Sequence, residues 1–210
     1  MPAPRVKPRA MMTLPRRPLL LAAVLLPLAA RAQGSPAAVI EGFHATLLEV
    51  MRNAQRLGVR GREQRLRPAM QAAFNLEAMT RISVGPPWAQ LQPAERQALI
   101  RAFSDWSIAT FANRFDGWSG ESFQLVGENP LQSGDRLVRT QLVRPRDEPV
   151  ALNYLMRESG GAWRVVDVYL AGTVSELASR RAEFTALLRE GGAARLEAEL
   201  RRRTETLLRG

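Results

Sequence analysis

The pattern of apolar residues changes its period twice along this chain, and this change limits the fold more than any other feature. Between Phe123 and Leu170, apolar and polar residues alternate in four consecutive segments, which is the period of half-buried β-strands. Short links rich in turn-forming residues join the segments, at 129–135, 145–149 and 159–161. Because parallel pairing needs a crossover of roughly a dozen residues or more, these links predict four consecutive antiparallel strands.

Helical spacing dominates on both sides of the predicted strands. Ser35 is a candidate N-cap with Pro36 in the first turn, and Gly191-Gly192 separates the last two helical segments. The predicted helices span residues 35–57, 68–74, 76–82, 94–115, 174–188 and 196–208. This order of helices, strands and helices predicts an α+β fold: a four-stranded curved antiparallel sheet with helices packed on its concave face, enclosing an apolar cavity.

The first residues have the composition of an export signal. Residues 1–18 carry five basic residues and no acid, residues 19–30 are apolar, and Ala30-Arg31-Ala32 follows. This order predicts a signal peptide at 1–32 and a single domain at 33–210. Since the apolar run is too short for a bilayer of ~30 Å, an uncleaved anchor is the weaker alternative. Translation could also begin at Met11 or Met12.

The net charge of +10 first suggests a nucleic-acid partner. Six of the 30 basic residues, and none of the 20 acids, lie in residues 1–32, so residues 33–210 carry a net charge of +4. The remaining arginines are interspersed with acids, which is typical of solvated helix faces. We therefore expect no nucleic-acid binding, and a mild preference for anionic lipid headgroups or membrane surfaces.

The sequence shows no arrangement of residues that indicates catalysis. It has no Cys and one His, and it lacks nucleophile-elbow, phosphate-loop and zinc-binding motifs. His44 reads as a structural residue. Asp167, in the middle of a predicted strand, fits an anchor that accepts hydrogen bonds or, alternatively, a catalytic acid. We expect a binding protein and no enzyme, with no catalytic residue, metal or cofactor.

An ordered set of residues resembles the MlaC family of periplasmic lipid-carrying proteins, also called toluene-tolerance auxiliary proteins. The resemblance covers about residues 39–207. Its helical part comprises Val84-Gly85, Trp88, Arg96, Ala102-Phe103 and Thr110-Phe111-Ala112. Its second part comprises Thr140, Val143, Tyr154, the run Trp163 to Val168, Gly172, Val174-Ser175, Arg181 and Phe184.

The resemblance implies a soluble periplasmic shuttle that encloses the acyl chains of a phospholipid. The implied partners are a membrane-anchored MCE-domain protein with its ABC transporter, or another membrane lipid-handling complex, and we expect a monomer. The segment Gly172–Ser175 is one residue longer than usual in the family and looks closer to the hopanoid-associated branch, HpnM. A hopanoid or other triterpenoid cargo is therefore an alternative, as is an accessory protein or enzyme of hopanoid biosynthesis on the same scaffold.

Candidate residues for the cavity wall come from one helix stripe and one strand face. They are Phe103, Phe111, Phe123, Leu125, Val138, Leu142, Leu152, Tyr154, Val166, Val168 and Leu170. Both faces of the last strand are apolar, so the sequence leaves open which face is inward, and each of these residues also fits a plain core. Four further residues are assigned to structural anchoring: Trp88, Trp163, Asp167 and Arg181.

Overall fold

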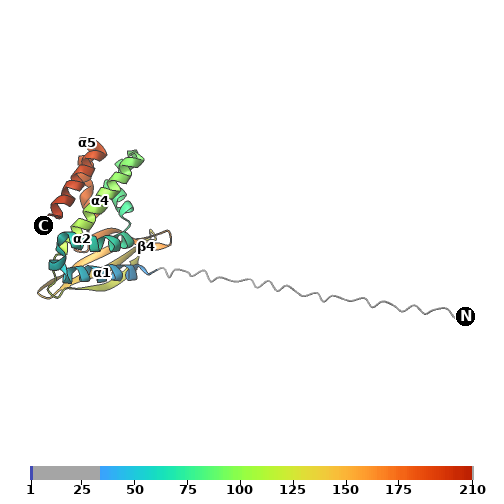
Figure 1. Cartoon of the computed structure of the whole chain (residues 1–210), viewed down its shortest axis with the longest axis vertical. Coiled ribbons are helices and arrows are strands. Elements are labelled where there is room, and N and C mark those ends of the chain that lie inside the picture. Colours follow the sequence, from blue (N-terminus) through green and yellow to red (C-terminus); the bar gives the residue numbers. More distant parts are fainter. Residues whose placement is uncertain (2–33, 210) are drawn as a thin grey trace. The chain divides into compact units, whose positions relative to one another are not determined.

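The computed structural model of the protein describes Met1 and residues 34–209 (Figure 1). The predicted signal peptide therefore lies almost entirely outside the described residues. The helices are α1 (Pro36–Arg52), α2 (Ala54–Ala73), α3 (Leu76–Val84), the short 3₁₀-helix η1 (Pro86–Gln90), α4 (Pro93–Arg114) and α5 (Glu176–Leu207). The strands are β1 (Ser122–Pro130), β2 (Arg136–Arg144), β3 (Asp147–Ser159), β4 (Ala162–Leu170) and β5 (Val174–Ser175).

The strands form one antiparallel sheet in the order β1-β2-β3-β4-β5. This confirms the predicted α+β class and the antiparallel meander. The prediction of four strands was wrong by one, because β5 has only two residues and a two-residue pairing leaves no alternation to detect. It pairs with Tyr169 and Leu170 and leads directly into α5.

Helix α1 begins as its sequence predicts, because the Ser35 side chain accepts a hydrogen bond from the backbone N–H of Ala38. Its buried stripe contains Ile40, Phe43 and Leu47, and it packs against the sheet and α2. The helix ends at Arg52, earlier than predicted, since Asn53 leaves helical geometry.

The basic stretch at 60–67 is helical, so the prediction of a short helix beginning at Pro68 was wrong. Helix α2 is kinked at Gly58, where φ is +59°, and then runs through Pro68. Leu66 and Met70 bury its inner face. Arg62 is buried as well, and its guanidinium donates hydrogen bonds to the carbonyl oxygens of Ala112 (2.7 Å) and Ala54 (3.1 Å). Nothing in this charged stretch distinguishes Arg62 from the other arginines, so its burial could not be predicted from the sequence.

Helices α4 and α5 run side by side (Figure 1). A capping box of Gln92 and Glu95 starts α4 next to Pro93. Helix α5 breaks at Gly191-Gly192, as the glycine pair predicts, and Gly192 has a φ of +67° that other residues adopt only with strain. The break gives α5 a first part at 176–190 and a second part at 193–207. In residues 34–209, every helix is too short or too polar to cross a bilayer.

Candidate functional site

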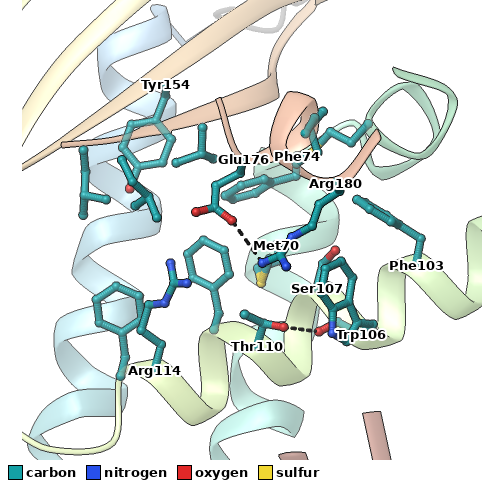
Figure 2. A pocket seen from close by; sticks show the side chains of 17 residues that line it. Met70, Phe74, Phe103, Trp106, Ser107, Thr110, Arg114, Tyr154, Glu176 and Arg180 are labelled. Carbon is teal, nitrogen blue, oxygen red and sulfur yellow. Dashed lines mark hydrogen bonds and ion pairs between the residues drawn. The ribbon is translucent and has the colours of Figure 1, made fainter. Parts of the chain in front are cut away.

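An apolar pocket lies where α2, α3, α4 and the first part of α5 meet the helix-covered face of β3 and β4 (Figure 2). Its apolar lining consists of Met70, Phe74, Met79, Phe103, Trp106, Phe111, Phe115, Leu152, Tyr154, Val168, Leu170 and Leu177. Its polar lining consists of Ser107, Thr110, Arg114, Glu176 and Arg180. Sites with this composition bind apolar molecules and orient them through a few polar groups.

Helix α4 forms one side of the pocket, because its lining residues recur at helical spacing. Phe103, Ser107 and Thr110 lie about one turn apart, with Phe111 and Arg114 continuing the same side of the helix. The aromatic side chains contact one another: the ring centroids of Phe111 and Phe115 are 5.7 Å apart, and those of Phe103 and Trp106 are 5.9 Å apart. One wall of the pocket therefore consists of aromatic rings packed against one another.

The register of the sheet supplies the opposite wall. Leu152 pairs with Leu170, and Tyr154 pairs with Val168, so four side chains from two strands form two adjacent rows on one face. The structure thereby determines which face of the last strand is inward, a point the sequence left open. A β-bulge in β4 places Val166 as the extra residue between Val165 and Asp167 and takes it out of these rows.

The pocket is narrow, with a volume of about 70 Å³. Ligand pockets for drug-sized molecules commonly hold roughly 300–1,000 Å³. A second, wider groove of about 560 Å³ shares Arg114, Phe115, Leu152 and Leu170 with it. Binding of a long chain therefore requires the side chains of the narrow pocket to move apart, or the wider groove to take part.

Charged side chains from two helices line the pocket. The Arg180 guanidinium lies 5.0 Å from the centroid of the Trp106 ring, and Arg180 Nη2 is 3.5 Å from Glu176 Oε2. Figure 2 shows Arg114 and Arg180 entering from α4 and α5, with the Glu176 carboxylate between them in this view. The Thr110 hydroxyl donates a hydrogen bond to the Trp106 carbonyl oxygen at 2.8 Å, so its proton is not available to a ligand.

The structure brings together six of the predicted wall residues: Phe103, Phe111, Leu152, Tyr154, Val168 and Leu170. Three others lie elsewhere on the surface: Phe123 and Leu125 line a shallow groove beside α1, and Leu142 lines the wider groove. Val138 and Val166 are fully buried. A contact of any of these residues with lipid stays a prediction.

The pocket also contains residues that could not be assigned to it from the sequence: Met70, Phe74, Met79, Trp106, Phe115 and the polar residues. The apolar residues belong to stripes that also fit a plain core, so only the packing of α2, α3 and α4 separates wall from core. Arg114, Glu176 and Arg180 have no distinguishing sequence signal, because charges near helix ends usually face solvent.

A buried polar pair lies next to the pocket. His44 Nε2 and the Tyr154 hydroxyl share a hydrogen bond of 2.9 Å, and the His44 ring stacks on Phe123 with centroids 4.0 Å apart. Burial lowers the pKa of His44 to about 4 and raises the pKa of Tyr154 above its ordinary value. His44 is therefore neutral near pH 7 and joins α1 to β3.

Asp167 lies where β4 meets α5 and is buried. Its carboxylate accepts hydrogen bonds from the Ser175 hydroxyl (2.6 Å) and from the backbone N–H groups of Val168 (2.8 Å) and Leu177 (3.4 Å). Every donor is part of the junction itself, and the anchoring role of Asp167 stays a prediction.

Of the other predicted anchors, Arg181 and Trp88 contact residues of neighbouring elements. Arg181 donates a hydrogen bond to the Ile82 carbonyl at 3.1 Å, and its aliphatic part lies against Gly85, where φ is +72° and a Cβ atom would come within 3.3 Å of it. Trp88 packs near the Arg96 guanidinium, 5.8 Å from the ring centroid, and Trp163 is a partly buried side chain against the core. Across the part of the chain that the structure describes, no three His, Asp or Glu residues are grouped to hold a metal ion.

The fold and the pocket define a small α+β protein with an apolar binding site between its sheet and its helices. The family model described as MlaC protein matches residues 41–202, and the chain belongs to this family. A solved structure of the phospholipid-binding protein from Ralstonia solanacearum, in complex with a phospholipid, matches with a TM-score of 0.71. The two sequences are 20% identical, and the match covers 81% of this chain and 97% of that chain.

Proposed function

We propose that this chain is a periplasmic carrier that holds the acyl chains of a lipid in the pocket between its sheet and α4 and α5. The observation that carries the proposal is the lining, which combines Phe and Met side chains with only five polar residues. Met70 and Met79 are unbranched and adapt readily to flexible chains. Membership of the MlaC family and the phospholipid bound to the similar Ralstonia protein support this function.

Burial of the acyl chain supplies the affinity in this proposal. Each methylene transferred from water to an apolar site contributes ~0.8 kcal/mol, so a sixteen-carbon chain contributes on the order of 10 kcal/mol before the costs of ordering. Neither a covalent step nor a metal is needed. Because the pocket is narrow, loading of a long chain either widens it or uses the adjoining wider groove beside Arg114.

In this proposal, a signal peptide at residues 1–32 directs the chain to the periplasm, where it meets its membrane partners. A carrier of this kind exchanges its cargo with a membrane-anchored MCE-domain protein and its ABC transporter. Fractionation of cells that express the full chain would locate it, and we expect the protein in the periplasmic fraction. The segment Gly172–Ser175 leaves a hopanoid-type cargo as the alternative. Mass spectrometry of the bound lipid would identify such a cargo.

Extraction of lipid from the purified protein tests the function. After expression in a Gram-negative host, the unmodified chain should yield bound lipid by mass spectrometry. Ser107→Trp places an indole in the pocket and should lower the bound lipid at least tenfold. Asn113→Trp adds the same group at an exposed site of α4 outside the pocket and should retain it. A protein that yields no lipid from its host envelope would contradict the carrier function.

A further inference from the structure

The narrow pocket has an open side and a closed side. Its five polar residues, on α4 and α5, are half-buried or exposed, whereas Met70, Phe74 and Tyr154 on the other side are buried. The core lies directly behind Phe74, because the ring centroids of Phe43 and Phe74 are 4.9 Å apart. A lipid tail that enters past the polar residues therefore ends against this buried side.

Tyr154, which extends from the sheet into the pocket (Figure 2), has a second space behind it. This space is the shallow groove beside α1, with a volume of about 240 Å³ and a lining that includes His44, Leu48, Phe123 and Leu125. Tyr154 belongs to the pocket lining and His44 to the groove lining, and their hydrogen bond of 2.9 Å joins the two. One side chain from each space thus separates the pocket from the groove.

A second pair of side chains completes this separation. Phe115 lines the pocket and Phe123 lines the groove, with their ring centroids 6.3 Å apart. Phe123 in turn stacks on the His44 ring at 4.0 Å. We call these four residues the partition: Tyr154 and Phe115 on the pocket side, and His44 and Phe123 on the groove side. The partition is two side chains thick.

The hydrogen bond makes the partition less adaptable than the rest of the lining. Rotation of Tyr154 or His44 away from the other would leave two buried polar groups without a partner, which is energetically unfavourable. Met70 and Met79, elsewhere in the lining, have unbranched side chains that adapt readily to a flexible ligand. When a lipid tail pushes the lining apart, the methionines should therefore move while the partition stays closed.

We propose that the partition limits the length of the acyl chain that the carrier accepts, with His44 acting as a positioning residue for Tyr154. This inference rests on the proposed carrier function. A chain longer than the pocket keeps its excess methylenes outside, and each methylene left in water lowers the affinity about fourfold. Removal of the partition joins the pocket to the groove beside α1, whose mostly apolar lining accepts the excess.

A competition between two lipids that differ only in chain length tests the assignment. The purified protein is incubated with vesicles that contain equal amounts of dioleoylphosphatidylglycerol and dierucoylphosphatidylglycerol, which is four carbons longer in each chain. The retained lipids are measured by mass spectrometry, and the unmodified chain should retain at least about tenfold more of the shorter lipid. The double variant His44→Ala/Tyr154→Leu opens the partition and should raise the ratio of longer to shorter lipid at least about fivefold.

Leu196→Ala is the matched control, since Leu196 is buried in the second part of α5 and lines neither space. It also removes buried side-chain volume, and it should leave the ratio of the two lipids unchanged. Thermal unfolding checks that each variant is folded. If the double variant is not, Tyr154→Phe keeps the ring, removes only the hydrogen bond to His44, and should raise the ratio at least about twofold.

The outcomes separate this inference from the carrier function. Equal retention of both lipids by the unmodified chain, or the same ratio in the unmodified chain and the folded partition variant, would overturn the length limit while the carrier function stands. A ratio that rises in Leu196→Ala as much as in the partition variant would assign the effect to a loosened core and would also overturn it. If no form retains either lipid, the carrier function itself fails.

Discussion

The two parts of α5 are each held by a buried carboxylate, and the two carboxylates have different partners. Asp167, before the first part, accepts hydrogen bonds only from a hydroxyl and backbone N–H groups. Glu199, in the second part, accepts from Arg202 and Arg203 and lies 3.7 Å from Arg195. The first part supplies Glu176, Leu177 and Arg180 to the pocket. In the second part, Arg203 forms an ion pair with Glu183 of the first part.

A buried acid therefore stabilises this protein in one of two ways. Asp167 satisfies backbone donors that water cannot reach, so its loss leaves them unpaired. Glu199 neutralises arginines that remain partly in water, so its loss is compensated by solvent and salt. Stability of the first part should therefore depend on hydrogen-bond geometry, and that of the second part on charge.

Replacement of Asp167 should have the largest effect. Asp167→Leu leaves the N–H groups of Val168 and Leu177 and the Ser175 hydroxyl unpaired, which should lower the free energy of unfolding by about 4 kcal/mol. Asp167→Asn keeps an acceptor oxygen and should cost about 1 kcal/mol or less. Urea denaturation measures both, and equal stability of the two variants would contradict the anchoring role.

The pH dependence of the stability should distinguish the effect of the buried His44 from that of the charged second part of α5. The unfolded chain binds a proton at His44 near pH 6.5, whereas the folded chain does so only near pH 4. The contribution of His44 to the stability is therefore fully present above pH 6.5 and falls by about 3 kcal/mol as the pH drops to 4. Denaturation of His44→Gln, which keeps a neutral hydrogen-bonding group beside Tyr154, should show a much smaller slope between pH 6.5 and 4.5; a slope equal to that of the unmodified chain would refute it.

Glu199 should contribute less and at lower pH. Hydrogen bonds from Arg202 and Arg203 lower the pKa of Glu199 to about 2, so its stabilisation is present above pH 4.5 and is lost as the pH falls toward 2. Glu199→Gln should cost about 1–2 kcal/mol at pH 7, because the arginines stay partly solvated. High salt should narrow the difference between the variant and the unmodified chain; a cost that salt leaves unchanged would argue against a charge effect.

The smallest effect is expected at the surface pair of Glu197 and Arg201, in which the Glu197 side chain is half-buried. Their side chains are 2.6 Å apart at i,i+4 spacing, and that of Arg201 is 64% exposed. Glu197→Gln should change the stability by about 0.5 kcal/mol or less. A cost comparable to that of Glu199→Gln would remove the distinction between the buried acid with several arginine partners and the half-buried acid with one.

Much of the architecture could be predicted because it depends on local pattern. Ser35, Pro93 and Gly191-Gly192 mark helix boundaries through their backbone chemistry, and alternation with short links specifies the meander. The helix through Pro68 could not be predicted this way, because it depends on the burial of Arg62 beneath the end of α4. Tertiary contacts there outweigh the local signals against a helix.

The candidate site was predictable only in part, for a related reason. Leu152, Tyr154, Val168 and Leu170 share a face once the register is known, but a bulge removes Val166 and the edge position of β1 takes Leu125 away. A bulge and an edge are properties of paired strands, which single-strand alternation does not contain.

The fold class, the order of the four long strands and the helices around them, the lack of cysteine chemistry and the resemblance to the MlaC family could all be read from the sequence. The packing of the elements was needed to show which apolar residues line a pocket, that Asp167 contacts both β4 and α5, and that Arg114 and Arg180 line the same cavity. The physical reason is that periodicity records which side of an element is buried, whereas a binding site is made where the buried sides of α4, α5 and the sheet fail to fill the space between them.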